Sequence, residues 1–183
     1  MAASVKRIVG ETTFAMLISA TVSILAGLFL QVEVERLLTF PFLLSLIPPI
    51  NDMGGNIGSM LGARLSSALH LGLIRPGIER QRALDENMAE SIGSGLLSFI
   101  VAGVLLLVWG TVRGIVSPIG FFLTFIMAGA ILTPIIVVST VFITVVSYVK
   151  RLDPDNVVGP LITSIADVLG VLVLLLVSKL LWG

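Results

Sequence analysis

Five long apolar segments alternate with polar connections along the 183-residue chain. Each segment reaches or exceeds the ~20 residues that an α-helix needs to cross a bilayer. The one long polar connection, RPGIERQRALDENMAE, is expected to form a surface helix after Pro76 and Gly77. The pattern predicts an all-α integral membrane protein with five transmembrane helices, over residues 8–30, 37–73, 89–109, 117–148 and 157–182.

The lysines and arginines between these segments predict their orientation, because positive residues accumulate in cytosolic loops. With the N-terminus inside, the cytosolic side collects Lys6, Arg7, Arg75, Arg80, Arg82, Lys150 and Arg151. The outer side holds Arg36, Arg113 and Lys179. The asymmetry predicts a cytosolic N-terminus and, after five crossings, a C-terminus outside the cell.

Composition narrows the class of protein. The chain is 56% hydrophobic and 12% charged, whereas soluble domains are about 25% charged. The absence of cysteine excludes disulfides and thiolate metal sites, and a formal charge of zero offers no basic surface for nucleic acid. No nucleophile–base pair or phosphate-binding loop is recognisable, so an enzyme is not expected. We expect a single transmembrane domain over residues 1–183 in the plasma membrane, without a cleavable signal or cytosolic regulatory domain.

Asp167 is an acidic residue deep within the last predicted helix. It lies ten residues into that segment, roughly 15 Å from the cytosolic start and near the midplane. An aspartate there costs about 2.5–3.5 kcal/mol on insertion scales, so it should face a partner or water. A cation or proton site is one interpretation, with Thr163 adding an oxygen from the same helix face. A protonated Asp167 bonded to a neighbouring helix is the alternative.

The second apolar segment contains the polar stretch PPINDMGGNIGSMLGARLSSALHLG, residues 48–72. Pro48 and Pro49 interrupt a helical hydrogen-bond ladder, and Gly54 and Gly55 form a further weak point. We therefore expect a broken helix at this position. Irregular backbone at membrane depth survives only when it is buried in protein or lines a water-filled cavity.

Small residues in the same stretch recur at the four-residue spacing that lets transmembrane helices approach closely. They are Gly54, Gly58 and Gly62, with Gly55 beside the first of them. Close packing without a pore accounts for such glycines equally well. The distinguishing residue is Asn56, which would present amide oxygen where the helices meet.

The available ligands are oxygen atoms, which suit Mg²⁺, Mn²⁺ or Ca²⁺ without distinguishing among them. A single buried aspartate does little to neutralise a divalent ion, whereas two copies of Asp167 facing one another across a twofold axis would. The residues thus predict a homodimer with a cation pathway at its axis. Asp52, beside the expected break, is either a second ligand or pore-mouth attractor, or a helix cap.

Two motifs resemble a known family. GNIGSMLGARLSSALHLG, residues 55–72, is similar to a signature of solute carrier family 41, and DPDNVVGPLITSIADVLG, residues 153–170, is similar to that family's D-P-D-N…P-x-x-T-x-x-x-D-x-x-G segment. Both belong to the MgtE-type magnesium transporter superfamily. The resemblance implies a dimer whose pore is lined by the second and fifth helices and carries Mg²⁺ or a similar ion. It assigns metal binding to Asp167, Asn56 and Thr163, and Gly170 becomes a pore-lining or packing position.

The chain also departs from the bacterial members of that superfamily. Ser59 and Met60 stand where the bacterial signature has asparagine and glutamine. The bacterial cytosolic N-terminal and paired CBS domains find no counterpart here, so their magnesium-sensing gate is not expected. Eukaryotic relatives carry two such units, and a single unit here favours a homodimer. Two other functions stay open: a proton- or sodium-coupled cation exchanger, and a non-transporting membrane subunit that packs against partners.

Overall fold

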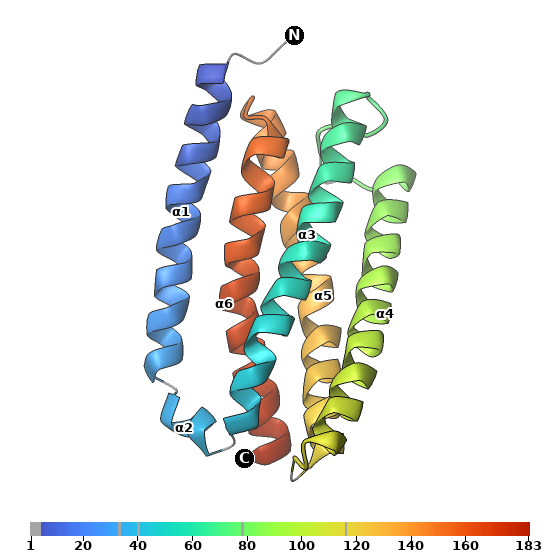
Figure 1. Ribbon diagram of the computed structural model, residues 1–183. Helices are drawn as coiled ribbons and strands as arrows, with labels where there is room; N and C mark the ends of the chain where they lie inside the picture. The colour runs from blue at the N-terminus through green and yellow to red at the C-terminus, as the bar shows by residue number, and fades with distance from the viewer. Residues whose placement is uncertain (1–4, 33, 40, 78, 116) are drawn as a thin grey trace.

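The protein is a bundle of long helices that run alternately up and down (Figure 1). The structure is a computed structural model that describes residues 5–32, 34–39, 41–77, 79–115 and 117–183. Over these ranges every regular element is helical, in agreement with the predicted fold class. The elements are α1 (Val5–Val32), α2 (Val34–Leu38), the 3₁₀ helix η1 (Pro41–Leu46), α3 (Ile47–His70), α4 (Arg82–Val112), α5 (Pro118–Val149) and α6 (Pro154–Trp182).

Four of the described helices are long and apolar enough to cross a membrane: α1, α4, α5 and α6, with 28, 31, 32 and 29 residues. They confirm four of the five predicted spans. The remaining long helix, α3, has 24 residues, a sufficient length at 1.5 Å per residue. It carries Asp52, Asn56 and Arg64, so length and composition alone do not mark it as a span.

The predicted break in the second segment is wrong. Pro48 and Pro49 occupy the first turn of α3, where an amide N–H has no partner within the helix and proline is tolerated. The helix then continues through Gly54 and Gly55 to His70. Departure from α-helical geometry comes earlier, in the 3₁₀ helix η1 that directly precedes α3.

The surface helix expected from residues 76–90 is also wrong in its extent. Residues 71–77 and 79–81 lie outside any helix, and the polar residues from Arg82 onward belong to the first turns of α4. There Arg82 Nε pairs with Glu86 Oε1 at 2.7 Å, one helical turn away. The polar stretch therefore extends a long helix beyond the apolar part instead of forming an element of its own.

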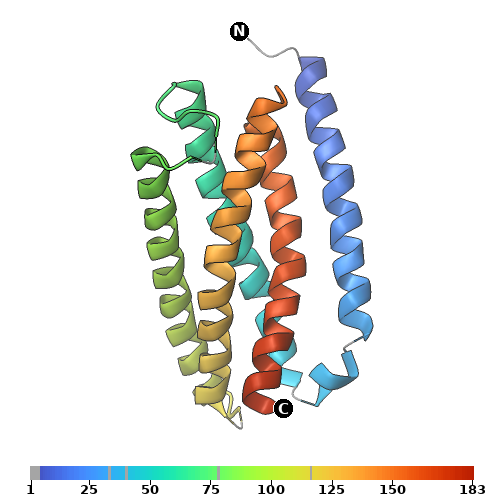
Figure 2. The same cartoon turned by 180° about the vertical axis from the view of Figure 1, so that it is seen from behind.

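Helix α5 lies at the centre of the packing, in contact with α3, α4 and α6. Its buried threonines satisfy their hydroxyls within the helix: Thr140 Oγ1 donates to Ile136 O at 2.8 Å, and Thr144 Oγ1 donates to Thr140 O at 2.7 Å. Helix α1, in contrast, lies at the edge of the bundle, beside α6, in both views (Figures 1 and 2). Because α1 packs on one side only, most of its surface is exposed.

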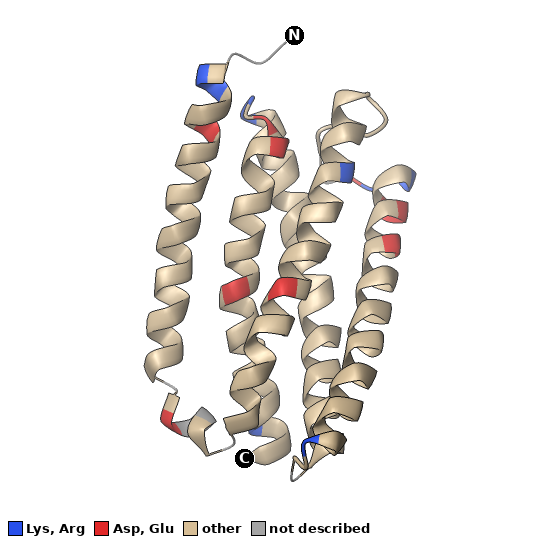
Figure 3. Cartoon of the chain, viewed as in Figure 1, with Lys and Arg blue, Asp and Glu red and all other residues tan. Residues whose placement is uncertain are grey.

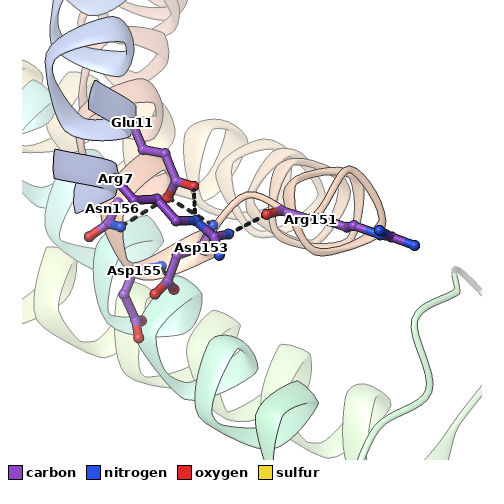
Figure 4. Close-up of polar contacts among 6 residues, drawn as sticks. All are labelled: Arg7, Glu11, Arg151, Asp153, Asp155 and Asn156. Atoms are coloured by element: carbon purple, nitrogen blue, oxygen red, sulfur yellow. Dashed lines mark hydrogen bonds and ion pairs between the residues drawn. The ribbon is translucent and has the colours of Figure 1, made fainter. Parts of the chain in front are cut away.

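A polar cluster ties the start of α1 to the start of α6 (Figure 4). Arg7 Nε donates to Glu11 Oε1 at 2.7 Å, and Arg7 also donates to the backbone carbonyl of Arg151. The second oxygen of Glu11 accepts from Asp153 N at 3.1 Å and from Asn156 Nδ2 at 3.0 Å. Glu11 thus bonds the first turn of α6, a role that the sequence did not indicate.

Candidate functional site

An open groove of about 470 Å³ lies between α3 and α6. Four candidate residues line it: Asp52 and Asn56 on α3, and Thr163 and Asp167 on α6. The described remainder of the lining is Ile47, Pro48, Asn51 and Gly55. Figure 3 shows acidic positions about halfway along the bundle on both helices, whereas most other charges gather near its ends. The two pairs of residues, which lie more than a hundred positions apart in sequence, therefore meet in one place.

On α3, the polar pair lies one helical turn apart and faces outward. Asn56 Nδ2 donates to Asp52 Oδ2 at 3.0 Å, and both residues are exposed. The opposite face of this helix is buried because its glycines point toward α5 and α6. The division into a glycine face and a polar face thus leaves the amide and carboxylate on the groove side.

On α6, the second polar pair also lies one turn apart. Thr163 is exposed, and its hydroxyl donates within the helix, to Pro160 O at 2.9 Å or Gly159 O at 3.1 Å. Asp167 is half-buried about midway along the helix and accepts a hydrogen bond from Ser23 Oγ of α1 at 3.1 Å. Since the threonine proton is used by the backbone, its oxygen lone pairs are the groups available toward the groove.

Close approach of α3 to α6 depends on glycine. A Cβ added at Gly55 would lie 3.0 Å from Thr163 Cγ2, one at Gly58 would lie 2.5 Å from Ile162 Cγ1, and one at Gly62 would lie 2.6 Å from Val158 Cγ1. At Gly54 an added Cβ would meet Leu132 Cδ2 at 3.1 Å and Ala166 Cβ at 3.2 Å. The absent side chains let the two helices, and so their polar pairs, lie side by side.

Asn51 is a groove residue that sequence reasoning missed. Its side chain lies against Gly170, where an added Cβ would collide with Asn51 Oδ1 and lie 3.2 Å from its Cγ. Of the described side chains, Asn51 Oδ1 and Thr133 Oγ1 are the buried polar atoms without a hydrogen-bond partner. The sequence signal for Asn51 is its place directly before Asp52, in a polar pair that precedes the glycines.

Ser23 is the other missed residue, since no motif marks it and it lies on a different helix. Arg64 of α3 pairs with Glu90 Oε2 of α4 at 3.2 Å, outside the groove lining. Its charge is therefore directed toward α4.

Among described residues, no three His, Cys, Asp or Glu side chains gather closely enough to hold a metal ion. One chain thus offers two carboxylates with amide and hydroxyl oxygens, a donor set of the kind preferred by Mg²⁺, Mn²⁺ and Ca²⁺.

Comparison with known families places this geometry in context. A family model described as MgtE, a divalent cation transporter, matches residues 47–177, which is more than half of the chain. The chain belongs to the MgtE divalent cation transporter family. The match covers α3 and all but the last five residues of α6, and it begins at α3, so α1 lies outside it. The MgtE chain is therefore a transporter-family protein and not an enzyme, as its sequence predicted.

A curated relative agrees with the resemblance to solute carrier family 41. Solute carrier family 41 member 3 from Rattus norvegicus is 27% identical over 149 residues, which cover 75% of this chain and 30% of the relative. The MgtE chain thus spans about 30% of the length of that relative. No solved structure matches the chain.

Proposed function

We propose that this chain conducts a divalent cation, Mg²⁺ foremost, across the plasma membrane through a pathway lined by α3 and α6. The observation that carries the proposal is the polar groove halfway along an otherwise apolar bundle. Polar residues inside a membrane are costly and face protein or a water-filled cavity. Asp52, Asn56, Thr163 and Asp167 act as the oxygen ligands, directly or through water.

The size of the groove supports passage of an ion that retains water. Mg²⁺ prefers octahedral coordination and gives up its waters reluctantly. Six waters at about 30 Å³ each occupy about 180 Å³, well below the groove volume of about 470 Å³. A largely hydrated Mg²⁺ therefore fits between the polar pairs. Mn²⁺ and Ca²⁺, which accept the same oxygen ligands, are the competing ions to compare.

A homodimer completes the pathway in this proposal. Asp52, Asn56 and Thr163 are exposed within one copy, and lipid-exposed polar groups at this depth are unfavourable. A second copy placed about a twofold axis covers the same surface on its partner, as symmetric dimers do. The two Asp167 carboxylates then supply the charge that a divalent ion requires.

The proposed membrane orientation has α1 starting in the cytosol and α6 ending outside, with α3 as the fifth crossing and residues 1–183 as one transport unit. The start of α1 and the end of α6 lie at opposite ends of the bundle (Figure 1). Blue Lys and Arg positions cluster at the end where α1 begins (Figure 3). The side chain of Arg36, expected outside, lies beyond the described ones.

The test is Mg²⁺ flux into proteoliposomes, with Asp167→Asn compared with wild type at matched folding and dimer content. The variant keeps the shape of the side chain but loses its charge, so flux should fall at least tenfold. Asp85→Asn is the matched control, since Asp85 lies at the start of α4 and pairs with Arg80 at 3.2 Å. It should transport like wild type.

The flux measurements distinguish a channel, a coupled exchanger and a non-transporting subunit. A dependence of flux on a proton or sodium gradient would favour a coupled exchanger over a channel. Equal flux by wild type and Asp167→Asn would remove Asp167 from the pathway. If neither protein carries Mg²⁺, Mn²⁺ or Ca²⁺, the chain is better described as a packing subunit.

A further inference from the structure

Helix α1 runs parallel to α6 in a constant register. Glu11 bonds Asn156, Ser19 bonds Ser164 and Ser23 bonds Asp167, with sequence separations of 145, 145 and 144 residues. In the described part of the chain, α6 is the one long helix against which α1 packs extensively. A constant separation means that the two helices advance together along the bundle, so each of these residues meets its partner on α6 at the same level.

The contact surface of α1 consists of small and polar residues. Its buried residues are Ala15 and Ala26, and Ser19 and Ser23 lie between them on the same face. Small residues allow close approach of transmembrane helices, and serines add hydrogen bonds across the interface. Large apolar residues such as Leu17 and Leu25 are exposed instead, as expected for a surface in contact with lipid.

The hydroxyl of Ser23 reaches Asp167 from α1, a helix outside the α3–α6 pair that lines the groove. It donates to Oδ2 at 3.1 Å, while the same carboxyl group lines the groove shared with Asn56 and Thr163. Ser23 itself is outside the described groove lining. An ionised carboxylate accepts about four hydrogen bonds or ligand contacts, so one bond from Ser23 leaves acceptor capacity for a cation.

We propose that Ser23 is a positioning residue for the cation site: it holds the Asp167 carboxylate in the orientation that faces the groove. The inference rests on the proposed function of Asp167 and adds a role for α1, which the family match does not include. A ligating carboxylate that is fixed by an outer hydrogen bond loses less freedom when it binds an ion. Removal of such outer partners costs 10–100-fold in metal affinity in other sites.

The experiment measures Mg²⁺ flux into proteoliposomes as a function of Mg²⁺ concentration for Ser23→Ala and Ser23→Thr. Ser23→Ala should raise the half-saturating concentration about tenfold and lower the maximal rate less. Ser23→Thr retains the hydroxyl and should return the half-saturating concentration close to the wild-type value. Should Ser23→Ala fail to fold, Ser23→Cys, whose thiol is a weak donor, should give an intermediate rise.

Ser19→Ala is the matched control, because it removes a hydroxyl from the same helix face without touching Asp167. It should leave the half-saturating concentration unchanged. Equal shifts in Ser19→Ala and Ser23→Ala, or no rescue by threonine, would assign Ser23 to helix packing alone and overturn the inference. Loss of flux in Asp167→Asn together with wild-type behaviour in Ser23→Ala also overturns it, while the proposed function stands. Wild-type flux in Asp167→Asn instead removes Asp167 from the pathway and overturns the inference, whereas absence of flux from every protein, wild type included, overturns the proposed function itself.

Discussion

Asn51 packs its amide against α6 at a point where only glycine leaves room. Its Oδ1 is buried against Gly170, and Ile50 Cγ2 would lie 3.3 Å from a Cβ added there. Asn51 Oδ1 has no hydrogen-bond partner among the described protein groups, so its position is set by packing against α6. At the residue scale, the wall of the site thus depends on a contact between Asn51 and Gly170, which lie 119 residues apart in sequence.

The contact predicts a coupled pair of substitutions. Gly170→Ala should destabilise the protein by about 1–3 kcal/mol, because the new methyl group collides with Asn51 Oδ1. In an Asn51→Ala background the colliding atom is gone, so the same change should cost much less. Thermal unfolding in detergent of the four proteins measures the cycle. Additive effects would show that Asn51 and Gly170 are independent.

At the scale of elements, α3 and α6 form the site because α3 has two chemically different faces. Glycines on one face approach α5 and α6, and Asp52 and Asn56 on the other remain accessible. In a membrane, helix association depends on packing and hydrogen bonds because lipid is as apolar as the helix surface. Loss of close packing along this face would therefore separate the two polar pairs.

Gly58 is the sharpest place to test this packing. A Cβ there would lie 2.5 Å from Ile162 Cγ1 and 3.1 Å from Ile136 Cγ2, so Gly58→Ala should cost about 1–3 kcal/mol of stability despite its better helix propensity. Gly93→Ala on α4 is the control, since its Cβ would meet nothing within 4 Å. It should be neutral or stabilising in thermal unfolding. Similar behaviour of the two variants would refute tight packing at Gly58.

At the scale of the whole molecule, the arrangement leaves one side of α3 without cover. Asp52, Asn56 and Met60 follow one another at four-residue spacing, and each is exposed. The described bundle packs α4 and α5 on the other sides of α3, with α6 beside the groove. The exposed polar groups of Asp52 and Asn56 and the apolar side chain of Met60 form the surface that the proposed second copy would cover.

Cross-linking tests this arrangement directly, because the chain has no cysteine of its own. Met60→Cys should give covalent dimers in membranes treated with a short thiol-to-thiol cross-linker. Leu105→Cys on α4 is the matched control, with 66% exposure against 57% for Met60. It should stay monomeric. Dimers in both variants would indicate random collisions, and dimers in neither would contradict pairing through α3.

The sequence predicted the helices better than their contacts. Four apolar spans, the polar pairs at residues 52 and 56 and at 163 and 167, and the relation to the MgtE family followed from hydropathy and two motifs. The predicted break in α3 was wrong, because the pair Pro48–Pro49 looks the same in sequence whether it interrupts a helix or begins one. Ser23 and Asn51 were missed because neither lies in a pattern that specifies its neighbour.

The sequence alone determined that the chain is helical and suited to a membrane, because backbone groups in lipid must bond within their own segment and apolar length is readable locally. It also predicted which oxygen-bearing side chains are candidate ligands: Asp52, Asn56, Thr163 and Asp167. Only the tertiary structure decided which of them meet. The rotation of α3, the parallel register of α1 on α6 and the bond from Ser23 to Asp167 arise from packing between distant segments. Such contacts depend on how glycine and serine surfaces fit together, which no local pattern records.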